Sequence, residues 1–200
     1  MNTPKLKDVN LVSDGWIKKY KITYDMPDGR EHGYEVASRK SPDAYRALLD
    51  ANGAGVKLEG ADAICIVART PRESLVMIRE FRYPLNSWCI AFPAGLLERG
   101  EDPVECADRE LREETGYAIT PDSRTRLLPQ AGYSSTGMSD ETVQVIFVDA
   151  ERVEDAHTEA NELIEVFELP IAQIRQFLDE NALPIGTRAQ LILEGMAASA

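Results

Sequence analysis

The spacing of hydrophobic and polar residues predicts strands in the first part of the chain. Two strand-like runs, Trp16 to Tyr24 and Glu31 to Ala37, flank the segment Met26 to Gly29. Its Pro-Asp-Gly sequence is a strong turn signal, so we expect a β-hairpin. A short helix is expected over Pro42 to Asn52.

Further along, the apolar runs become continuous, as in strands that are buried on both faces. Such runs occur at Ala63 to Ala68, Ser74 to Ile78, Trp88 to Phe92 and Val143 to Val148. Helical patterns cover residues 103–115, 171–180 and 187–198. Strands that alternate with a few helices indicate a mixed sheet between helical layers.

A segment with glycines at positions 53, 55 and 60 separates these two patterns. Glycine-containing stretches of this kind are typical of domain boundaries. We therefore expect an N-terminal β-hairpin appendage over residues 1–58 and a main domain over residues 59–200.

Composition narrows the possible partners. The 200 residues carry 34 acids and 22 bases, a net charge of −12, without a long Lys/Arg cluster. Such a chain should repel nucleic acid. No apolar run approaches the roughly 18 residues of a membrane span, and the N-terminus does not resemble a signal peptide. The chain has an odd number of cysteines, Cys65, Cys89 and Cys106, and none of them forms a CxxC motif. This pattern is typical of buried thiols, so we expect a cytoplasmic protein.

The segment after Leu97 specifies its own helix. Asp102 is a good N-cap, Pro103 suits the first helical position, and Glu105 completes a capping-box-like arrangement. Gly116 supplies a left-handed stop. The expected helix therefore runs from Pro103 to Thr115.

Three carboxylates share one face of this helix. At about 100° per residue, Glu110, Glu113 and Glu114 fall within one arc, whereas Val104 and Leu111 lie on another. Taken alone, three such glutamates are more typical of a solvated surface. Like charges at these spacings repel each other, and bound Mg²⁺ would reverse that effect.

The whole segment resembles the Nudix box, G-x5-E-x7-R-E-U-x-E-E-x-G-U, where U is aliphatic. The matching residues are Gly95, Glu101, Arg109, Glu110, Leu111, Glu113, Glu114 and Gly116. Tyr117 departs from the pattern at the last, aliphatic position. The resemblance implies a Nudix-type α/β/α sandwich with a mixed sheet and an enzyme that performs metal-assisted hydrolysis.

The same resemblance implies roles for single residues. Glu110, Glu113 and Glu114 would bind Mg²⁺ or Mn²⁺, with the backbone carbonyl of Ala94 or Gly95. Arg109 would orient a carboxylate within the catalytic machinery. Glu101 would either fix the loop or act as an outer ligand.

Segments outside the box resemble the ADP-ribose and nucleotide-sugar pyrophosphatase branch of the family. Arg79 to Pro84, followed by Phe92 to Gly95, looks like the branch's strand, its arginine-containing segment and its entry to the box. Arg79 and Arg82 are therefore candidate substrate contacts, with an ordinary surface ion pair as the alternative. The segment Tyr133 to Glu141 resembles a pocket loop of the branch and contributes Gly137 and Glu141. Thr136 replaces the proline of that loop, which weakens the case for ADP-ribose itself.

The family's general base often lies on a loop beyond the next strand. Here that region offers Glu162, just before an expected strand, and Glu159. Either carboxylate could deprotonate a water molecule, and a solvated acid is the alternative for each. Branch members also exchange a small N-terminal sheet between subunits, which implies a homodimer here.

The expected function is Mg²⁺-dependent hydrolysis of a nucleoside diphosphate derivative, with ADP-ribose converted to AMP and ribose 5-phosphate. A related nucleotide sugar fits equally. One alternative is hydrolysis of dinucleoside polyphosphates or oxidised nucleotides. The other is a catalytically silent domain that senses nucleotide sugars.

Overall fold

The computed structural model describes residues 3–56, 60–158 and 160–198. The chain forms two compact units. The first combines Met1–Asp62 with Ala131–Val143, and the second combines Ala63–Gln130 with Gln144–Ala200. The predicted boundary between residues 58 and 59 lies outside the described residues.

The first unit is a three-stranded antiparallel sheet with one helix. Its elements are β1 (Lys5–Ser13), β2 (Lys18–Asp25), β3 (Glu31–Ser38) and α1 (Pro42–Gly53). The predicted hairpin and helix are confirmed, but β1 extends the hairpin to three strands. The small core contains Tyr20 and Tyr45, whose ring centroids lie 4.6 Å apart, together with Ile22 and Leu48.

The segment 131–143 belongs to this first unit. It contains β10 (Gly132–Tyr133), which pairs with the start of β11 (Thr142–Arg152). The Ala37 amide donates to the Met138 carbonyl at 2.9 Å. The side chain of Lys40 forms an ion pair with Asp140 at 3.0 Å.

The second unit is built on a larger sheet with the strand order β11-β4-β5-β12. Further strands pair with this path: β6 with β5, β7 with β4, and both β8 and β9 with β11. The bounds of these strands are β4 (Ala63–Arg69), β5 (Ser74–Arg82), β6 (Ser87–Ala91), β7 (Ala94–Leu96), β8 (Tyr117–Ile119), β9 (Arg126–Leu127) and β12 (Ile164–Pro170). The four strands predicted from apolar runs are confirmed.

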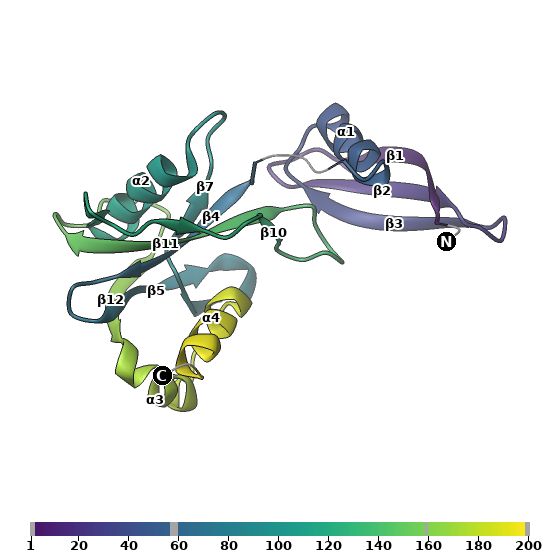
Figure 1. The fold of residues 1–200 in the computed structure, drawn as a ribbon. Helices are drawn as coiled ribbons and strands as arrows, with labels where there is room; N and C mark the ends of the chain where they lie inside the picture. The colour runs from purple at the N-terminus through teal and green to yellow at the C-terminus, as the bar shows by residue number, and fades with distance from the viewer. Residues whose placement is uncertain (1–2, 57–59, 159, 199–200) are drawn as a thin grey trace. The chain divides into compact units, whose positions relative to one another are not determined.

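Helices cover this sheet on both sides (Figure 1). The helix α2 (Pro103–Thr115) lies over β4 and β11, while α3 (Ile174–Glu180) and α4 (Thr187–Ala197) lie on the side of β5 and β12. The predicted helix over 171–180 begins with a 3-10 turn, Ile171–Gln173. Within the described part of the chain, no helix is long and apolar enough to cross a membrane.

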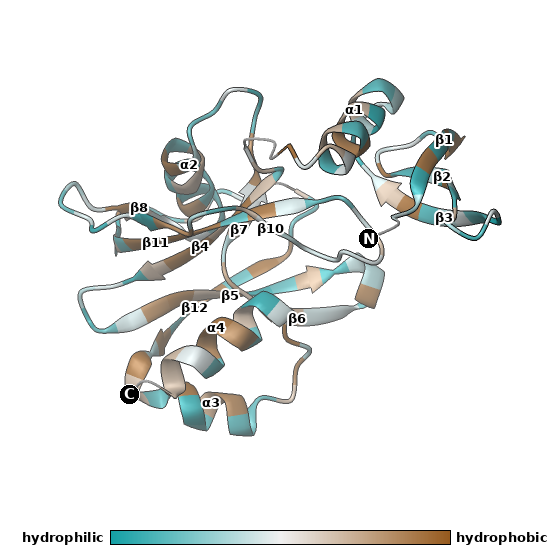
Figure 2. Ribbon diagram, turned by 45° about the vertical axis from the view of Figure 1, so that its right-hand side comes forward, coloured by the Kyte–Doolittle hydropathy of each residue, from teal (hydrophilic) through white to brown (hydrophobic). Residues whose placement is uncertain are grey.

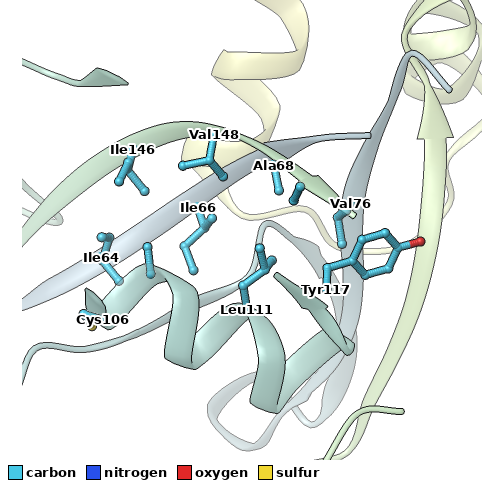
Figure 3. Packing of buried hydrophobic residues seen from close by; sticks show 11 residues of the cluster. Ile64, Ile66, Ala68, Val76, Cys106, Leu111, Tyr117, Ile146 and Val148 are labelled. Atoms are coloured by element: carbon cyan, nitrogen blue, oxygen red, sulfur yellow. The ribbon is translucent and has the colours of Figure 1, made fainter. Parts of the chain in front are cut away.

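The main core lies between α2 and the sheet. Ile64 and Ile66 of β4 and Ile146 of β11 are fully buried there against Leu111 of α2, as Figure 3 shows. In Figure 2 apolar residues dominate β4, whereas α2 has both polar and apolar faces. This packing fixes the orientation of α2 and therefore that of its glutamates.

Candidate active site

The predicted caps of α2 are present. The Asp102 carboxylate accepts hydrogen bonds from the amides of Val104, at 2.8 Å, and Glu105, at 3.4 Å. Gly116 ends the helix with a φ of 73°, in the left-handed region. The helix forms where the sequence predicts it because both ends are specified by local interactions.

The three glutamates of α2 share a region but differ in burial. Glu113 is exposed, Glu110 is half-buried, and Glu114 is only 7% exposed. An Oε2 atom of Glu114 accepts a hydrogen bond from the Ala94 amide at 3.1 Å. The helix therefore holds one of its carboxylates inside the protein, against the backbone of β7.

Burial raises the pKa of Glu114 well above its usual value, although the Ala94 amide opposes this. Negative charges on Glu110, Glu80 and Glu162 raise that pKa further. The pKa of Glu110 is also raised, first by burial and then by Glu113 and Glu162, against the opposing effect of Arg109. Carboxylates from α2, from β5 and from the segment before β12 are thus close enough to repel one another.

The same carboxylates are candidate ligands of a divalent cation. Among the described residues, no three His, Cys, Asp or Glu side chains converge as a ready-made metal centre. The donor chemistry nevertheless fits Mg²⁺ or Mn²⁺, because these ions prefer carboxylate and carbonyl oxygens. A cation would also compensate the buried, mutually repelling charges of Glu110 and Glu114.

Arg109 connects the acids to the loop before α2. Its Nε and Nη2 atoms donate to the two carboxylate oxygens of Glu101 at 2.9 and 3.0 Å. Its Nη1 atom donates to Glu110 at 2.7 Å and to Glu113 at 3.3 Å. Glu101 also accepts from the Glu98 amide at 2.9 Å, so it holds the loop. One guanidinium thereby orients two of the carboxylates predicted to bind metal.

The two candidate arginines of β5 have different environments. Arg79 forms an ion pair with Glu165 at 3.3 Å and lies over the Phe167 ring, 5.2 Å from its centroid. Arg82 forms an ion pair with Glu80 at 2.5 Å. Because side chains alternate along a strand, Glu80 and Arg82 share one face and Arg79 lies on the other. Both arginines form ion pairs, so the ion-pair alternative stays open for each, and only Arg82 shares the face of Glu80.

Glu80 was not among the predicted site residues. Its carboxylate raises the pKa of Glu114 and also pairs with Arg82. The available signal was its place two residues before Arg82 in an expected strand, since such residues share a face. That signal alone does not distinguish a site residue from a surface acid.

The charge of Glu162 raises the pKa of both Glu110 and Glu114. The following residue, Leu163, accepts a hydrogen bond from the Phe81 amide at 3.0 Å and so connects this segment to β5. The other candidate base, Glu159, lies outside the described residues.

Gly137 and Glu141 belong to the first unit. The carbonyl of Gly137 accepts a hydrogen bond from the Tyr34 hydroxyl at 2.7 Å. Glu141 forms an ion pair with Arg39 at 2.5 Å. The candidate pocket loop is therefore held by residues of β3 and of the segment that follows it.

Comparisons with known proteins agree with this arrangement. A model of the family described as NUDIX domain matches residues 59–188. An ADP-sugar pyrophosphatase from Mus musculus is 36% identical over 112 residues, which cover 54% of this chain and 45% of the relative. An ADP-ribose pyrophosphatase from Bacillus subtilis (strain 168) is 37% identical over 111 residues, covering 54% of this chain and 58% of that protein. The chain thus spans about half the length of these two relatives.

A solved structure of an ADP compounds hydrolase has the same fold. It superimposes with a TM-score of 0.62 at 19% identity, covering 88% of this chain and 83% of that one. The expected α/β/α sandwich with a mixed sheet and a small N-terminal antiparallel sheet is confirmed. Since the family model matches well over half of the sequence, the chain belongs to the Nudix family.

Proposed function

We propose that the chain hydrolyses the diphosphate bond of ADP-ribose or a related nucleotide sugar in a reaction that depends on a divalent cation. With ADP-ribose and water, the products would be AMP and ribose 5-phosphate. The observation that carries this proposal is the buried carboxylate of Glu114, which lies within reach of the charges of Glu80, Glu110 and Glu162. The names of the two pyrophosphatase relatives support the substrate class.

In this proposal Glu110, Glu113 and Glu114 hold the cation, Mg²⁺ or Mn²⁺, together with the backbone carbonyl of Ala94. When bound, the ion supplies charge neutralisation for the diphosphate oxygens and makes water more acidic. Arg109 contacts Glu110 and Glu113 and orients both carboxylates. Glu113 would also take part in catalysis, because its negative charge helps to hold the cation.

Glu162 would accept the proton of the attacking water, since its charge acts on both Glu110 and Glu114. Glu159 is the alternative base. Arg82, paired with Glu80, would bind a phosphate oxygen, because a guanidinium donates two parallel hydrogen bonds to such groups.

Three further residues are predicted substrate contacts. The positive charge of Arg79 would contribute to binding of the negatively charged substrate. Gly137 and Glu141 of the segment 131–143 remain proposed substrate contacts.

The domain division 1–58 and 59–200, a homodimer and a cytoplasmic location are also part of the proposal. Exposed apolar side chains on the first unit, namely Leu11, Val12, Trp16, Ile17 and Tyr34, support its use as a subunit interface. All three cysteines are free and buried, as expected for a reducing compartment.

A substrate panel tests this function. Purified protein with MgCl₂ is given ADP-ribose, GDP-mannose, UDP-glucose, a diadenosine polyphosphate or an oxidised nucleoside triphosphate. Released phosphomonoesters are measured as inorganic phosphate after phosphatase treatment. We expect release from ADP-ribose or another nucleotide sugar, and none with excess EDTA. Turnover restricted to the last two substrates would contradict the proposal, and no turnover at all would favour a sensing domain.

Variants of α2 test whether the glutamates of this helix are responsible for any turnover. Glu114→Gln should lower kcat by orders of magnitude because it removes a negative ligand while keeping the shape. Glu105→Gln makes the same change at an exposed position on the same helix and should keep activity. Equal kcat values for the two variants would overturn the assigned roles.

A further inference from the structure

Glu162 is held from both sides by one short segment at the end of β5. On its C-terminal side, the carbonyl of Leu163 accepts a hydrogen bond from the Phe81 amide at 3.0 Å. On its N-terminal side, the carbonyl of Asn161 accepts one from the Tyr83 hydroxyl, also at 3.0 Å. The backbone position of Glu162 therefore depends on Phe81 and Tyr83.

The first of these hydrogen bonds continues the pairing of β5 with β12, whereas the second depends on one side chain. Asn161 lies before β12, which begins at Ile164, so no strand pairing extends to it. The Tyr83 hydroxyl supplies the contact there. It is a specific connection between the turn that follows β5 and the segment that carries the candidate base.

The side chain of Tyr83 contacts a neighbouring aromatic ring, although the residue is 64% exposed. The Tyr83 ring packs edge-on against Phe81, with 5.5 Å between centroids. Phe81 packs edge-on against Trp88 of β6 at 6.0 Å. Such pairs have a defined geometry, and a ring held in this way can present its hydroxyl at a constant place.

Glu162 is the base in the proposed function, and its two flanking residues carry these hydrogen bonds. A carboxylate that takes a proton from water needs a place defined to a fraction of an ångström. Contacts on both flanking residues limit the positions that the Glu162 backbone can adopt.

We propose that Tyr83 is a positioning residue of the hydrolytic reaction, which acts through its hydroxyl on the backbone of Asn161 and so on Glu162. This inference rests on the proposed function, in which Glu162 is the base. Tyr83 itself needs no contact with substrate. Its loss should affect the chemical step and leave substrate binding unchanged.

The test is Tyr83→Phe, which removes one oxygen and keeps the ring against Phe81. Losing one hydrogen bond of this kind should lower kcat by about threefold to tenfold. KM for the nucleotide and the Mg²⁺ dependence should not change. Tyr20→Phe is the matched control, since the Tyr20 hydroxyl also donates to a backbone carbonyl, that of Lys40, at 2.8 Å within the first unit. An unchanged kcat in Tyr83→Phe would overturn the inference.

A double-mutant cycle separates positioning from general stabilisation. In a Glu162→Gln background the base is absent, so Tyr83→Phe should cause no further loss of kcat. An equal loss in both backgrounds would show that Tyr83 does not act through Glu162, and would also overturn the inference.

Amide hydrogen exchange gives a readout that does not depend on turnover. Tyr83→Phe should speed exchange at Glu162 and Leu163 by a similar factor, while Tyr20→Phe leaves it unchanged. If the wild-type protein hydrolyses no substrate, the proposed function fails, but faster exchange in Tyr83→Phe would still show that the Tyr83 hydroxyl restrains the backbone of this segment. Unchanged exchange in Tyr83→Phe would contradict that restraint.

Discussion

The carboxylate of Glu110 occupies the space that a side chain at position 95 would need. A Cβ atom on Gly95 would lie 1.9 Å from Cδ of Glu110 and 2.1 Å from its Oε1. Such distances are far below any tolerated contact between heavy atoms. A side chain at position 95 would therefore have to displace the carboxylate of Glu110, which is the far end of a flexible side chain.

Gly95→Ala should displace Glu110 and lower kcat at least tenfold, because this carboxylate is a proposed ligand. The control is Gly195→Ala, where an added Cβ on α4 meets no atom within 4 Å. Alanine in a helix should stabilise that variant by up to about 1 kcal/mol. Steady-state kinetics and thermal unfolding of both variants check this, and full activity in Gly95→Ala would show that Glu110 is not needed where it lies.

Arg109→Lys should lower kcat about tenfold or more while the protein remains folded. An ammonium group cannot bind both oxygens of Glu101 and reach Glu110 together, as the guanidinium does. Arg112→Lys is the control on the same helix, because Arg112 pairs with Asp108. Equal kcat values for the two variants would show that Arg109 does not orient the catalytic carboxylates.

The sequence predicts α2 well because every signal for it is local. Asp102 and Gly116 lie at its ends, and the side chains that share a face follow from the helical repeat. The difference between exposed Glu113 and buried Glu114 is not local. It depends on where β7 passes, and β7 (Ala94–Leu96) is a short strand that no apolar run indicates.

Gly116→Ala should destabilise the second unit more than Gly100→Ala. Both glycines have positive φ, 73° and 84°, and an L-residue there costs roughly 1–2 kcal/mol. At Gly116 the added Cβ would also lie 2.2 Å from the carbonyl oxygen of Glu154, whereas at Gly100 it meets no atom within 4 Å. Urea unfolding measures both free energies, and equal losses would mean that this clash relaxes at no cost.

Tyr117, the departure from the family pattern, predicts a pH dependence of stability. Its ring is buried and its hydroxyl donates to Glu168 at 2.5 Å. Burial, together with Glu168, raises the pKa of Tyr117 to about 12. Burial alone would raise the pKa of Glu168, but hydrogen bonds from Arg72 and Tyr117 outweigh it and the pKa is lowered.

The signs of the two effects follow. Glu168 contributes stability above the pKa of an unfolded glutamate, about 4.3, which is lost as the pH falls through its folded pKa. Tyr117 contributes stability below the pKa of an unfolded tyrosine, about 10, and this stability is lost as the pH rises toward 12. Unfolding free energies across pH should show a smaller alkaline loss in Tyr117→Phe and a smaller acid loss in Glu168→Gln. Unaltered profiles would contradict the coupling.

Two other parts of the fold show what a single sequence cannot provide. The strand β1 was not predicted, because Leu6 and Val9 are its only partly buried positions and its charged residues resemble a polar terminus. The contact between Tyr83 and Asn161 joins residues that are 78 positions apart. Neither hydrophobic periodicity nor a motif contains information on such a pair.

In the proposed site, acids of α2 hold a divalent cation against a nucleotide diphosphate. Crystals soaked with MnCl₂ and the α,β-methylene analogue of ADP-ribose, with diffraction collected at the manganese edge, test this most directly. We expect an anomalous peak in contact with carboxylate oxygens of Glu110, Glu113 and Glu114. An ordered analogue with no manganese beside these side chains would contradict it.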